Sequence, residues 1–468
     1  MRGAKRPAAP RQKEAQVQTI IVGAGTVGFD LARQLLKAKH DIAVIERDSQ
    51  RCAQIGEKLD VLAIPGMGTS PPSLESAGIG DAELCIAVTS VDEVNILVCS
   101  MAEQYGVPTR IARVRNRELT APDSPIDLAS LGVTRVINPE RLVVRIIDHI
   151  ARIPDAVEVF GYHDGEVLIA RHIMTDQMPV IGRSLLEIPN ILAADHYFLA
   201  VAIKRGGRTW IPAGDDRLQP GDDVTTVFPF TSLPEYLRAL GLSRRRVRRA
   251  VVAGQGLTVQ LLCETLRAWI EDVTLIDPDP ADGQSAAESL QGLDVIEGDP
   301  TDRTVLQEVN VSKTDLFVGA GRSTTQNVMG ALLARSEGAP KVLAVSYEPQ
   351  NNRLFRQIGV SHVVSPRRAM TQEIMDVIHR GRGAMELQLR DMPLESFELR
   401  AEIDSPITAG PLSDVWAPWR RKAIIGAVIR DGRPLLPRGE TRIQPEDDVI
   451  VITEPKHVDR ISKLFRRR

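Results

Sequence analysis

The residues best suited to bind a ligand form a glycine-rich hexapeptide near the start of the chain. The sequence G-A-G-T-V-G occupies 23–28 and follows the short apolar run TIIV. In a dinucleotide-binding turn, the first glycine permits the tight turn, the second lets the backbone approach a pyrophosphate, and the third lets the helix pack closely on the strand. The N–H groups at the helix start then face the phosphates. The predicted nucleotide contacts in this turn are Gly23, Ala24, Gly25, Thr26, Val27 and Gly28.

An acidic residue, Glu46, closes the next apolar run, DIAVIE. A carboxylate at this place can accept hydrogen bonds from both ribose hydroxyls and would repel a 2′-phosphate. The pattern therefore favours NAD(H) or an adenosine nucleotide over NADP(H). Arg47 leaves an alternative open, because an arginine there could accept that phosphate rather than lie exposed beside the site. For the whole motif, the alternative is a turn that serves packing alone.

Further polar residues follow other apolar runs of the same region. Ligands of an open parallel sheet lie beyond the carboxyl ends of its strands, and those ends here carry 66–69 (GMGT), Thr89, Ser90 and Arg113. Arg113 lies in RIARVR, where a fixed guanidinium could hold a terminal phosphate through two hydrogen bonds. A surface ion pair is the other interpretation of Arg113.

The elements that would position these residues alternate between apolar strands and helices. From 17 to about 150, β-branched runs of four to seven residues alternate with helical stretches. This pattern indicates a doubly wound, Rossmann-like parallel sheet covered on both faces. From 155 to 230 the strands become short and alternating, with Gly, Pro and Asp between them. That texture is typical of a small α+β domain.

The whole arrangement occurs twice. VQTIIVGAGTVG (17–28) recurs as RRAVVAGQGLTV (248–259), and Asn95 and Asn327 lie 232 residues apart. RGGRTWIPAGDDRLQPGD (205–222) recurs as RDGRPLLPRGETRIQPED (430–447). A spacing held over such lengths indicates duplication. We predict a disordered basic tail at 1–16 and α/β and α+β domains in turn at 17–150, 155–240, 247–380 and 384–465.

The second copy has lost part of the predicted site. It keeps Gly254, Gly256 and Asp277, whereas Gly28, Thr89 and Arg113 align with a valine, a glycine and a valine at 259, 321 and 345. A β-branched residue at the third glycine position should push the helix away from the strand. We expect this copy to bind a nucleotide weakly, if it binds one at all.

Composition excludes several classes of protein. No apolar run approaches the 18 or more residues of a membrane span, and the net charge of −3 among 468 residues gives no nucleic-acid footprint. The basic stretches SRRRVRR (243–249) and FRRR (465–468) are interpreted as solvated segments, or alternatively as contacts for anionic lipid or an acidic partner. The four cysteines have no paired spacing, so we expect reduced core thiols at Cys52, Cys85, Cys99 and Cys263.

Nothing in the sequence forms a recognisable catalytic or metal centre. The eight histidines are scattered, with no Glu-x-x-His or His-x-x-x-His pair, and no G-x-S-x-G elbow is present. A dehydrogenase needs a proton donor or acceptor beside its nicotinamide. We therefore expect no catalytic residues and no metal, and a nucleotide that acts as a signal rather than as a reactant.

These motifs together resemble those of a known family. With GAGTVG and the repeated small domains, the stretches IAVTSVDEVNILVC (86–99) and RIARVRN (110–116) resemble the TrkA-type regulators of bacterial potassium uptake. Those proteins are tandem regulator-of-potassium-conductance (RCK) domains, each a Rossmann lobe followed by a small C-terminal lobe. The resemblance covers 17 to 465. It implies that the first lobe binds NAD(H) or ATP/ADP through Gly23–Gly28, Glu46, Thr89 and Arg113. Met67 stands where the family often has a polar residue near the adenine, which leaves nucleotide preference open.

The resemblance also implies a function and partners. We expect a non-enzymatic, cytoplasmic regulatory subunit, peripheral on the inner face of the cell membrane, that docks on a membrane-embedded potassium-transporting subunit and shifts its open and closed populations. The chain is expected to form a homodimer or homotetramer and to bind no nucleic acid. Two alternatives remain: an NAD-dependent oxidoreductase with unrecognised catalytic residues, and a regulatory module of another cation channel or of an antiporter.

Overall fold

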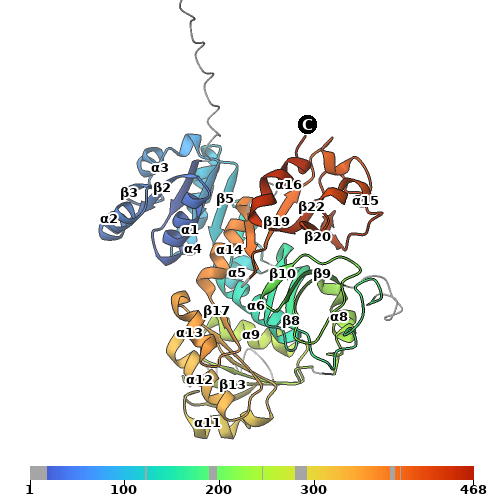
Figure 1. Ribbon diagram of the computed structural model, residues 1–468. Coiled ribbons are helices and arrows are strands. Elements are labelled where there is room, and N and C mark those ends of the chain that lie inside the picture. Colours follow the sequence, from blue (N-terminus) through green and yellow to red (C-terminus); the bar gives the residue numbers. More distant parts are fainter. Residues whose placement is uncertain are drawn as a thin grey trace, which may run out of the picture. The chain divides into compact units, whose positions relative to one another are not determined.

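The computed structural model describes residues 18–121, 124–188, 198–244, 246–279, 292–379, 385–389 and 392–467. The predicted tail at 1–16 lies outside these ranges. The chain divides into two compact units, the first ending at Pro139 and the second beginning at Glu140 (Figure 1).

The first unit is built on a six-stranded parallel sheet of order β3-β2-β1-β4-β5-β6. The chain winds outward from β1 to β3 and then crosses back to β4, so β1 and β4 flank the point where the strand order reverses. This topology confirms the predicted doubly wound fold. The strands are β1 (Gln18–Val22), β2 (Asp41–Glu46), β3 (Leu62–Pro65), β4 (Leu84–Ala87), β5 (Thr109–Arg113) and β6 (Arg135–Ile137). The α-helices are α1 (Thr26–Lys37), α2 (Ser49–Lys58), α3 (Pro71–Ser76), α4 (Asp92–Gln104) and α5 (Arg117–Thr120).

The second unit begins with helix α6 (Pro139–Arg152) and contains a second six-stranded parallel sheet. Its order, β14-β13-β12-β15-β16-β17, repeats that of the first sheet. The strands are β12 (Arg249–Ala253), β13 (Asp272–Asp277), β14 (Asp294–Glu297), β15 (Leu316–Gly319), β16 (Lys341–Val345) and β17 (His362–Val364). The described helices around it are α9 (Leu257–Arg267), α11 (Arg303–Glu308), α12 (Thr324–Ser336), α13 (Asn352–Gln357) and α14 (Pro366–His379).

Two small antiparallel sheets complete the second unit, each of five strands. The first has the order β10-β9-β11-β8-β7 and the second the order β18-β19-β22-β20-β21. The strands of the first small sheet are β7 (Glu158–Tyr162), β8 (Val167–Ile173), β9 (Leu199–Arg205), β10 (Arg208–Trp210) and β11 (Asp223–Pro229), and α8 (Leu233–Ala239) follows them in the chain. The second sheet has β18 (Met385–Gln388), β19 (Glu395–Arg400), β20 (Ala423–Arg430), β21 (Arg433–Leu435) and β22 (Asp448–Thr453), with α15 (Leu412–Val415) and α16 (Val458–Phe465).

The repeated segment of the small domains encodes a repeated ion pair. Arg205 meets the buried Asp222 through two hydrogen bonds of 2.5 and 2.7 Å. At the same place in the second copy, Arg430 meets the buried Asp447 at 2.9 and 2.7 Å. Each carboxylate also accepts a backbone N–H at 2.8 Å, from Gln219 and from Gln444. A planar guanidinium matches a carboxylate in this two-bond geometry, which fixes the loop before the central strand of each sheet.

The two small sheets share one hydrophobic core. The cluster joins Val201 and Val227 of the first sheet to Ile429 and Ile450 of the second, all buried. Across this core the Tyr162 hydroxyl is hydrogen-bonded to the Ser396 hydroxyl. A larger cluster joins α6, the first small sheet and the second parallel sheet. The second unit is therefore held by cores that cross the boundaries between its sheets.

The cysteines are all buried and free, as the sequence predicts. Burial raises the pKa of each thiol, to about 12 for Cys99 and Cys263. A thiol with so high a pKa is a poor nucleophile and a poor metal ligand.

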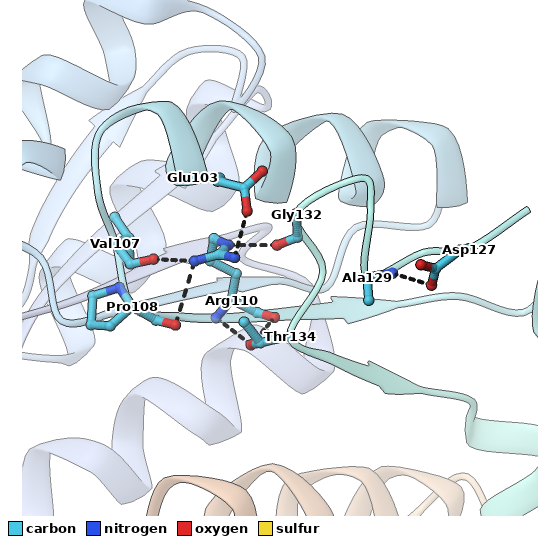
Figure 2. A network of polar contacts seen from close by, with 8 residues as sticks. All are labelled: Glu103, Val107, Pro108, Arg110, Asp127, Ala129, Gly132 and Thr134. Atoms are coloured by element: carbon cyan, nitrogen blue, oxygen red, sulfur yellow. Dashed lines mark hydrogen bonds and ion pairs between the residues drawn. The ribbon is translucent and has the colours of Figure 1, made fainter.

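Arg110 connects three segments by hydrogen bonds at the amino end of the first sheet (Figure 2). Arg110 donates from Nε to the Gly132 carbonyl at 2.5 Å, from Nη1 to the Val107 carbonyl at 2.5 Å, and from Nη2 to Glu103 at 2.9 Å. Its backbone N–H donates to the Thr134 hydroxyl at 2.7 Å. The side chain thereby joins the end of α4, the turn before β5 and the loop before β6.

Replacing Arg110 with alanine should destabilise the first unit, because it leaves two carbonyls and a carboxylate without their donor. We expect a loss of about 2–3 kcal/mol in the free energy of unfolding of that unit. Arg51→Ala is the matched control, because its side chain is 61% exposed and its ion pair with Asp48 spans 3.9 Å. Amide hydrogen exchange over 18–139 measures the effect, since all four tryptophans lie in the second unit. Equal protection in both variants would contradict the assignment.

A buried histidine connects the first small sheet to the segment before it. His172, fully buried on β8, lies with Nε2 3.0 Å from the Pro154 carbonyl oxygen and Nδ1 3.0 Å from the Tyr236 hydroxyl. The carbonyl can only accept, so Nε2 carries the proton and the Tyr236 O–H donates to Nδ1. Burial lowers the pKa of His172 to about 4, against the opposing effect of the Pro154 carbonyl and Asp155.

Acid should therefore destabilise the second unit. The unfolded chain binds a proton at His172 near pH 6.5 and the folded chain only near pH 4, so stability is complete above pH 6.5 and falls as the pH drops toward 4. The loss is about 3 kcal/mol for this residue. Tryptophan fluorescence during urea unfolding at pH 7, 6, 5 and 4.5 measures it. His172→Gln should flatten the pH dependence by about one proton, whereas His163→Gln, in the turn between β7 and β8, is the control and should leave it unchanged.

Candidate functional site

The predicted glycine turn lies between β1 and α1, at the carboxyl edge of the first sheet. Gly23 has φ +106°, in the left-handed region, and its N–H donates to the Ile45 carbonyl at 2.9 Å. A Cβ on Gly28 would lie 1.9 Å from the Gly23 carbonyl oxygen, so only glycine fits there. A Cβ on Gly25 would meet nothing within 4 Å. The turn is thus closed on its inner side and open in front of Gly25.

The start of α1 offers backbone donors to this open side. Gly25 is the residue that precedes the helix, and in the described structure no side chain caps it and no acidic residue occupies the first turn. The first N–H groups of any α-helix lack partners within the helix. With the positive end of the helix dipole they form a site suited to an anion.

Glu46 lies at the end of β2, buried, with its carboxylate directed at the turn. One carboxylate oxygen accepts the Ala24 N–H at 2.6 Å, and the other accepts the Asp48 N–H at 3.0 Å. The side chain therefore also holds the glycine turn in place. Each carboxylate oxygen has a second lone pair, so both can still accept from a hydroxyl group.

Asn95 on α4 joins the two loops on the other side of the turn. This fully buried amide accepts the Thr89 N–H at 2.9 Å and the Thr89 hydroxyl at 2.7 Å through Oδ1. Its Nδ2 donates to the Thr89 carbonyl at 3.2 Å and to the Arg113 carbonyl at 2.8 Å. The ends of β4 and β5 are thus held at a fixed spacing. From the sequence, Asn95 was recognised only as a residue that recurs in the second copy, as Asn327.

Thr89, Ser90 and Arg113 all lie at this carboxyl edge. A Cβ on Gly23 would lie 3.2 Å from the Thr89 N, which places the β4 loop directly beside the glycine turn. Ser90 is exposed in that loop, and Arg113, the last residue of β5, is half-buried. The parallel sheet therefore brings the predicted residues of four strands to one edge.

Asp92, the first residue of α4, orders the loop after β5. One of its carboxylate oxygens accepts the backbone N–H groups of Arg115 and Asn116, both at 2.7 Å. The role of Asp92 is therefore structural, because the backbone N–H groups that it binds are those of the neighbouring loop.

The second copy has the same strands but a different turn. Gly256 has φ +93°, whereas its counterpart Gly25 has −64°. A Cβ on Gly254 would lie only 2.3 Å from the Gly321 N, so the two loops approach more closely than in the first copy. This altered turn accommodates Val259, which is buried at the position where the first copy admits only glycine.

Two side chains of the second copy complete the comparison. Asp277 ends β13, is buried, and accepts the Asp279 N–H at 2.9 Å, as Glu46 does from Asp48. Arg322 lies where the first copy has Ser90, and its guanidinium stands 3.4 Å from a Cβ built on Gly256. The space in front of the second turn is therefore partly taken by an arginine, which the sequence comparison missed because Arg322 lies outside the motif.

The described residues of both units hold no group of three or more histidine, cysteine or acidic side chains placed to bind a metal. Nor does any described helix have the length and apolar character needed to cross a bilayer.

The chain is similar to known proteins over nearly its whole length. The TrkA-N domain model matches residues 19–139 and again 250–366, and the TrkA-C domain model matches 397–466. The Trk system potassium uptake protein TrkA of Azorhizobium caulinodans is 28% identical, covering 96% of this chain and 99% of that protein. Its namesake from Haemophilus influenzae is 27% identical over the same shares.

Solved structures share the fold. The crystal structure of the GsuK RCK domain superposes with a TM-score of 0.58 at 16% identity, covering 99% of this chain and 98% of that one. The GsuK channel bound to NAD gives a TM-score of 0.61 at 16% identity, with 97% and 80% covered. The two TrkA-N matches coincide with the two parallel sheets, and each matched region begins in the strand that leads into the glycine turn described above. This chain belongs to the TrkA family.

Proposed function

We propose that this protein is a non-enzymatic, nucleotide-sensing regulatory subunit that binds and gates a membrane potassium transporter of the Trk type. The observation that carries the proposal is the open glycine turn beside Glu46, followed by a helix start that no side chain caps. It is supported by the similarity to TrkA proteins, which covers 96% of the chain. NAD(H) is the proposed ligand, with ATP or ADP as alternatives at the same place.

Each residue at the edge has a proposed role. The backbone N–H groups of Gly25–Gly28 would face the phosphates, and the remaining lone pairs of Glu46 would accept the ribose hydroxyls. Thr89 and Ser90 would line the space in front of the glycine turn, and Arg113 would meet a terminal phosphate. We call this space the first crevice and its counterpart in the second copy the second crevice. Gly254, Gly256 and Asp277 would form a weaker site in the second copy, where the turn is altered and Arg322 stands before it.

The ionisable groups at the first crevice support binding rather than turnover. Both Glu46 oxygens accept backbone N–H groups, and Asp92 does the same for the neighbouring loop. Such carboxylates are held as acceptors and are poorly placed to exchange protons with a substrate. The rival function, an NAD-dependent oxidoreductase, requires NADH turnover with a carbonyl substrate that a crevice variant abolishes.

Gating requires the nucleotide to discriminate between two conformations, because a ligand that binds both equally shifts nothing. Typical coupling of about 1–3 kcal/mol changes an open-to-closed ratio by roughly 5–150-fold. The proposed place of action is the inner face of the cell membrane, where the protein binds peripherally to the transporter.

The direct test is reconstitution of this chain with a Trk-type transporter in proteoliposomes. Rubidium influx should depend on the chain and should change about fivefold or more between saturating nucleotide and none. Co-purification with a channel or antiporter of another kind would support the alternative partner. Influx unaffected by both the chain and nucleotide would refute the proposal.

The first crevice should dominate nucleotide binding. Glu46→Gln, which removes charge but keeps the shape, should weaken NAD(H) binding by about tenfold, and Arg113→Gln by a similar factor. The matched second-copy variant, Asp277→Asn, should change the dissociation constant less than about twofold. Calorimetric titration with NADH, ATP and ADP measures all three.

Hydrogen exchange of 18–46 in the free protein is the control for Glu46→Gln, because the carboxylate also holds the turn. If Asp277→Asn weakens binding as much as Glu46→Gln, the two crevices are equivalent and the proposed asymmetry is wrong.

Exposed apolar residues recur on the two Rossmann lobes. Leu97 on α4 is 49% exposed and Met329, at the same place on α12, is 47% exposed. Leu131 and Ile358 are likewise exposed at matching positions, each directly before the glycine that precedes the last strand of its sheet. A face left apolar in both copies supports self-association of the chain through these helices, as a homodimer or homotetramer.

Glutamate at these places should weaken that assembly. Leu97→Glu and Met329→Glu should each shift the protein toward smaller species in sedimentation velocity, with a dissociation constant raised about tenfold or more. Leu186→Glu, at a residue 68% exposed in the first small domain, is the control and should have no effect. A monomeric wild-type protein at all concentrations would contradict the proposed assembly.

A further inference from the structure

Helix α6 follows directly in the chain from the last strand of the first sheet but belongs to the second unit. Its side chains are fixed to the second Rossmann lobe along the helix. Arg145 pairs with Glu373 of α14 at 2.9 Å, and Asp148 accepts the Trp269 indole N–H at 2.8 Å. The Arg152 guanidinium lies 4.4 Å from the centre of the Trp269 ring.

The end of α6 is capped from the second sheet by Lys341. This lysine is the first residue of β16, and its ammonium donates to the carbonyls of Ile150 and of Ile153, the latter at 3.1 Å. The last carbonyls of a helix lack partners within it, and a cation there is favoured by the helix dipole. Burial lowers the pKa of Lys341 to about 8 while Asp155 acts in the opposite direction, so the amine remains largely protonated at pH 7.

Two histidines hold the residues that follow. The Pro154 carbonyl accepts from His172 of β8 at 3.0 Å, and His362 of β17 is hydrogen-bonded to the backbone of Ala156. Segment 150–156 is therefore bound by side chains from β8, β16 and β17. Segments that act as hinges have few such contacts, because they must change their backbone angles freely.

We infer that segment 150–156 is a clamp rather than a hinge, and that Lys341 is the positioning residue that makes α6 and the second Rossmann sheet move as one body. When α6 is displaced, the second Rossmann lobe is then displaced with it, because segment 150–156 does not bend. That the displacement originates in nucleotide binding rests on the proposed function, whereas the clamp itself does not.

The clamp is tested without nucleotide by hydrogen exchange of the full chain. Lys341→Met keeps an aliphatic chain but removes the donor, so amides in 148–156 should exchange about tenfold faster or more. Exchange over 250–277 should stay within about twofold, because the shared hydrophobic core is untouched. Lys313→Met, at an exposed lysine of the same unit, is the matched control and should alter neither region.

A change below about twofold in 148–156 overturns the clamp. Should Lys341→Met fail to fold, Lys341→Gln, which can still donate to one carbonyl, should give an intermediate acceleration confined to 148–156. An acceleration spread evenly over the second unit in that variant also overturns the inference.

The coupling is tested with NADH. In the wild type, NADH bound at the first crevice should change the rate of amide hydrogen exchange within 250–366, a region distant from that crevice in the sequence. In Lys341→Met its dissociation constant should stay within about twofold, while that remote response falls about fivefold or more. A full remote response in the variant overturns the inference. If NADH neither binds nor alters the wild type, the proposed function fails, and exchange without nucleotide still decides the clamp.

Discussion

The absence of a side chain at Gly28 is the constraint on which the candidate site depends. A Cβ there would lie 1.9 Å from the Gly23 carbonyl oxygen, closer than any packing adjustment can relieve. With glycine in place, α1 begins directly behind the turn and its first N–H groups face the open edge. The second copy shows the result of breaking the constraint: Val259 is accommodated, but Gly256 takes a left-handed backbone angle and the two crevice loops come together.

The fold could be predicted well from the sequence because each strand and helix is encoded by the pattern of apolar residues within its own segment. Apolar runs of β-branched residues predicted the strands, and the repeated segment at 205–222 and 430–447 predicted the duplication of the small domain. The structure shows the same ion pair in both copies of that segment. The strand order then places the predicted site residues at one edge without further assumptions.

The parts that sequence did not reveal involve partners far apart in the chain. Asn95 recurs as Asn327, yet its role depends on backbone groups of Thr89 and Arg113 that no spacing rule connects. The contact of Glu46 with the Ala24 N–H was likewise invisible, since the motif suggests only a ribose partner. The sequence gives no sign of the role of Lys341, because a lysine at the start of a strand is ordinarily exposed. Its partners lie at the end of α6 and just beyond it, in the preceding repeat.

The shared core of the two small sheets has a further consequence for assembly. Tyr162 and Ser396 meet across it, although they belong to different repeats. Were the repeats separate polypeptides, this pairing would weaken on dilution, whereas a covalent tether of this kind supplies an effective concentration of order millimolar whatever the amount of protein in the cell. Joining the two repeats in one chain therefore makes this pairing intramolecular rather than bimolecular, and so independent of expression level.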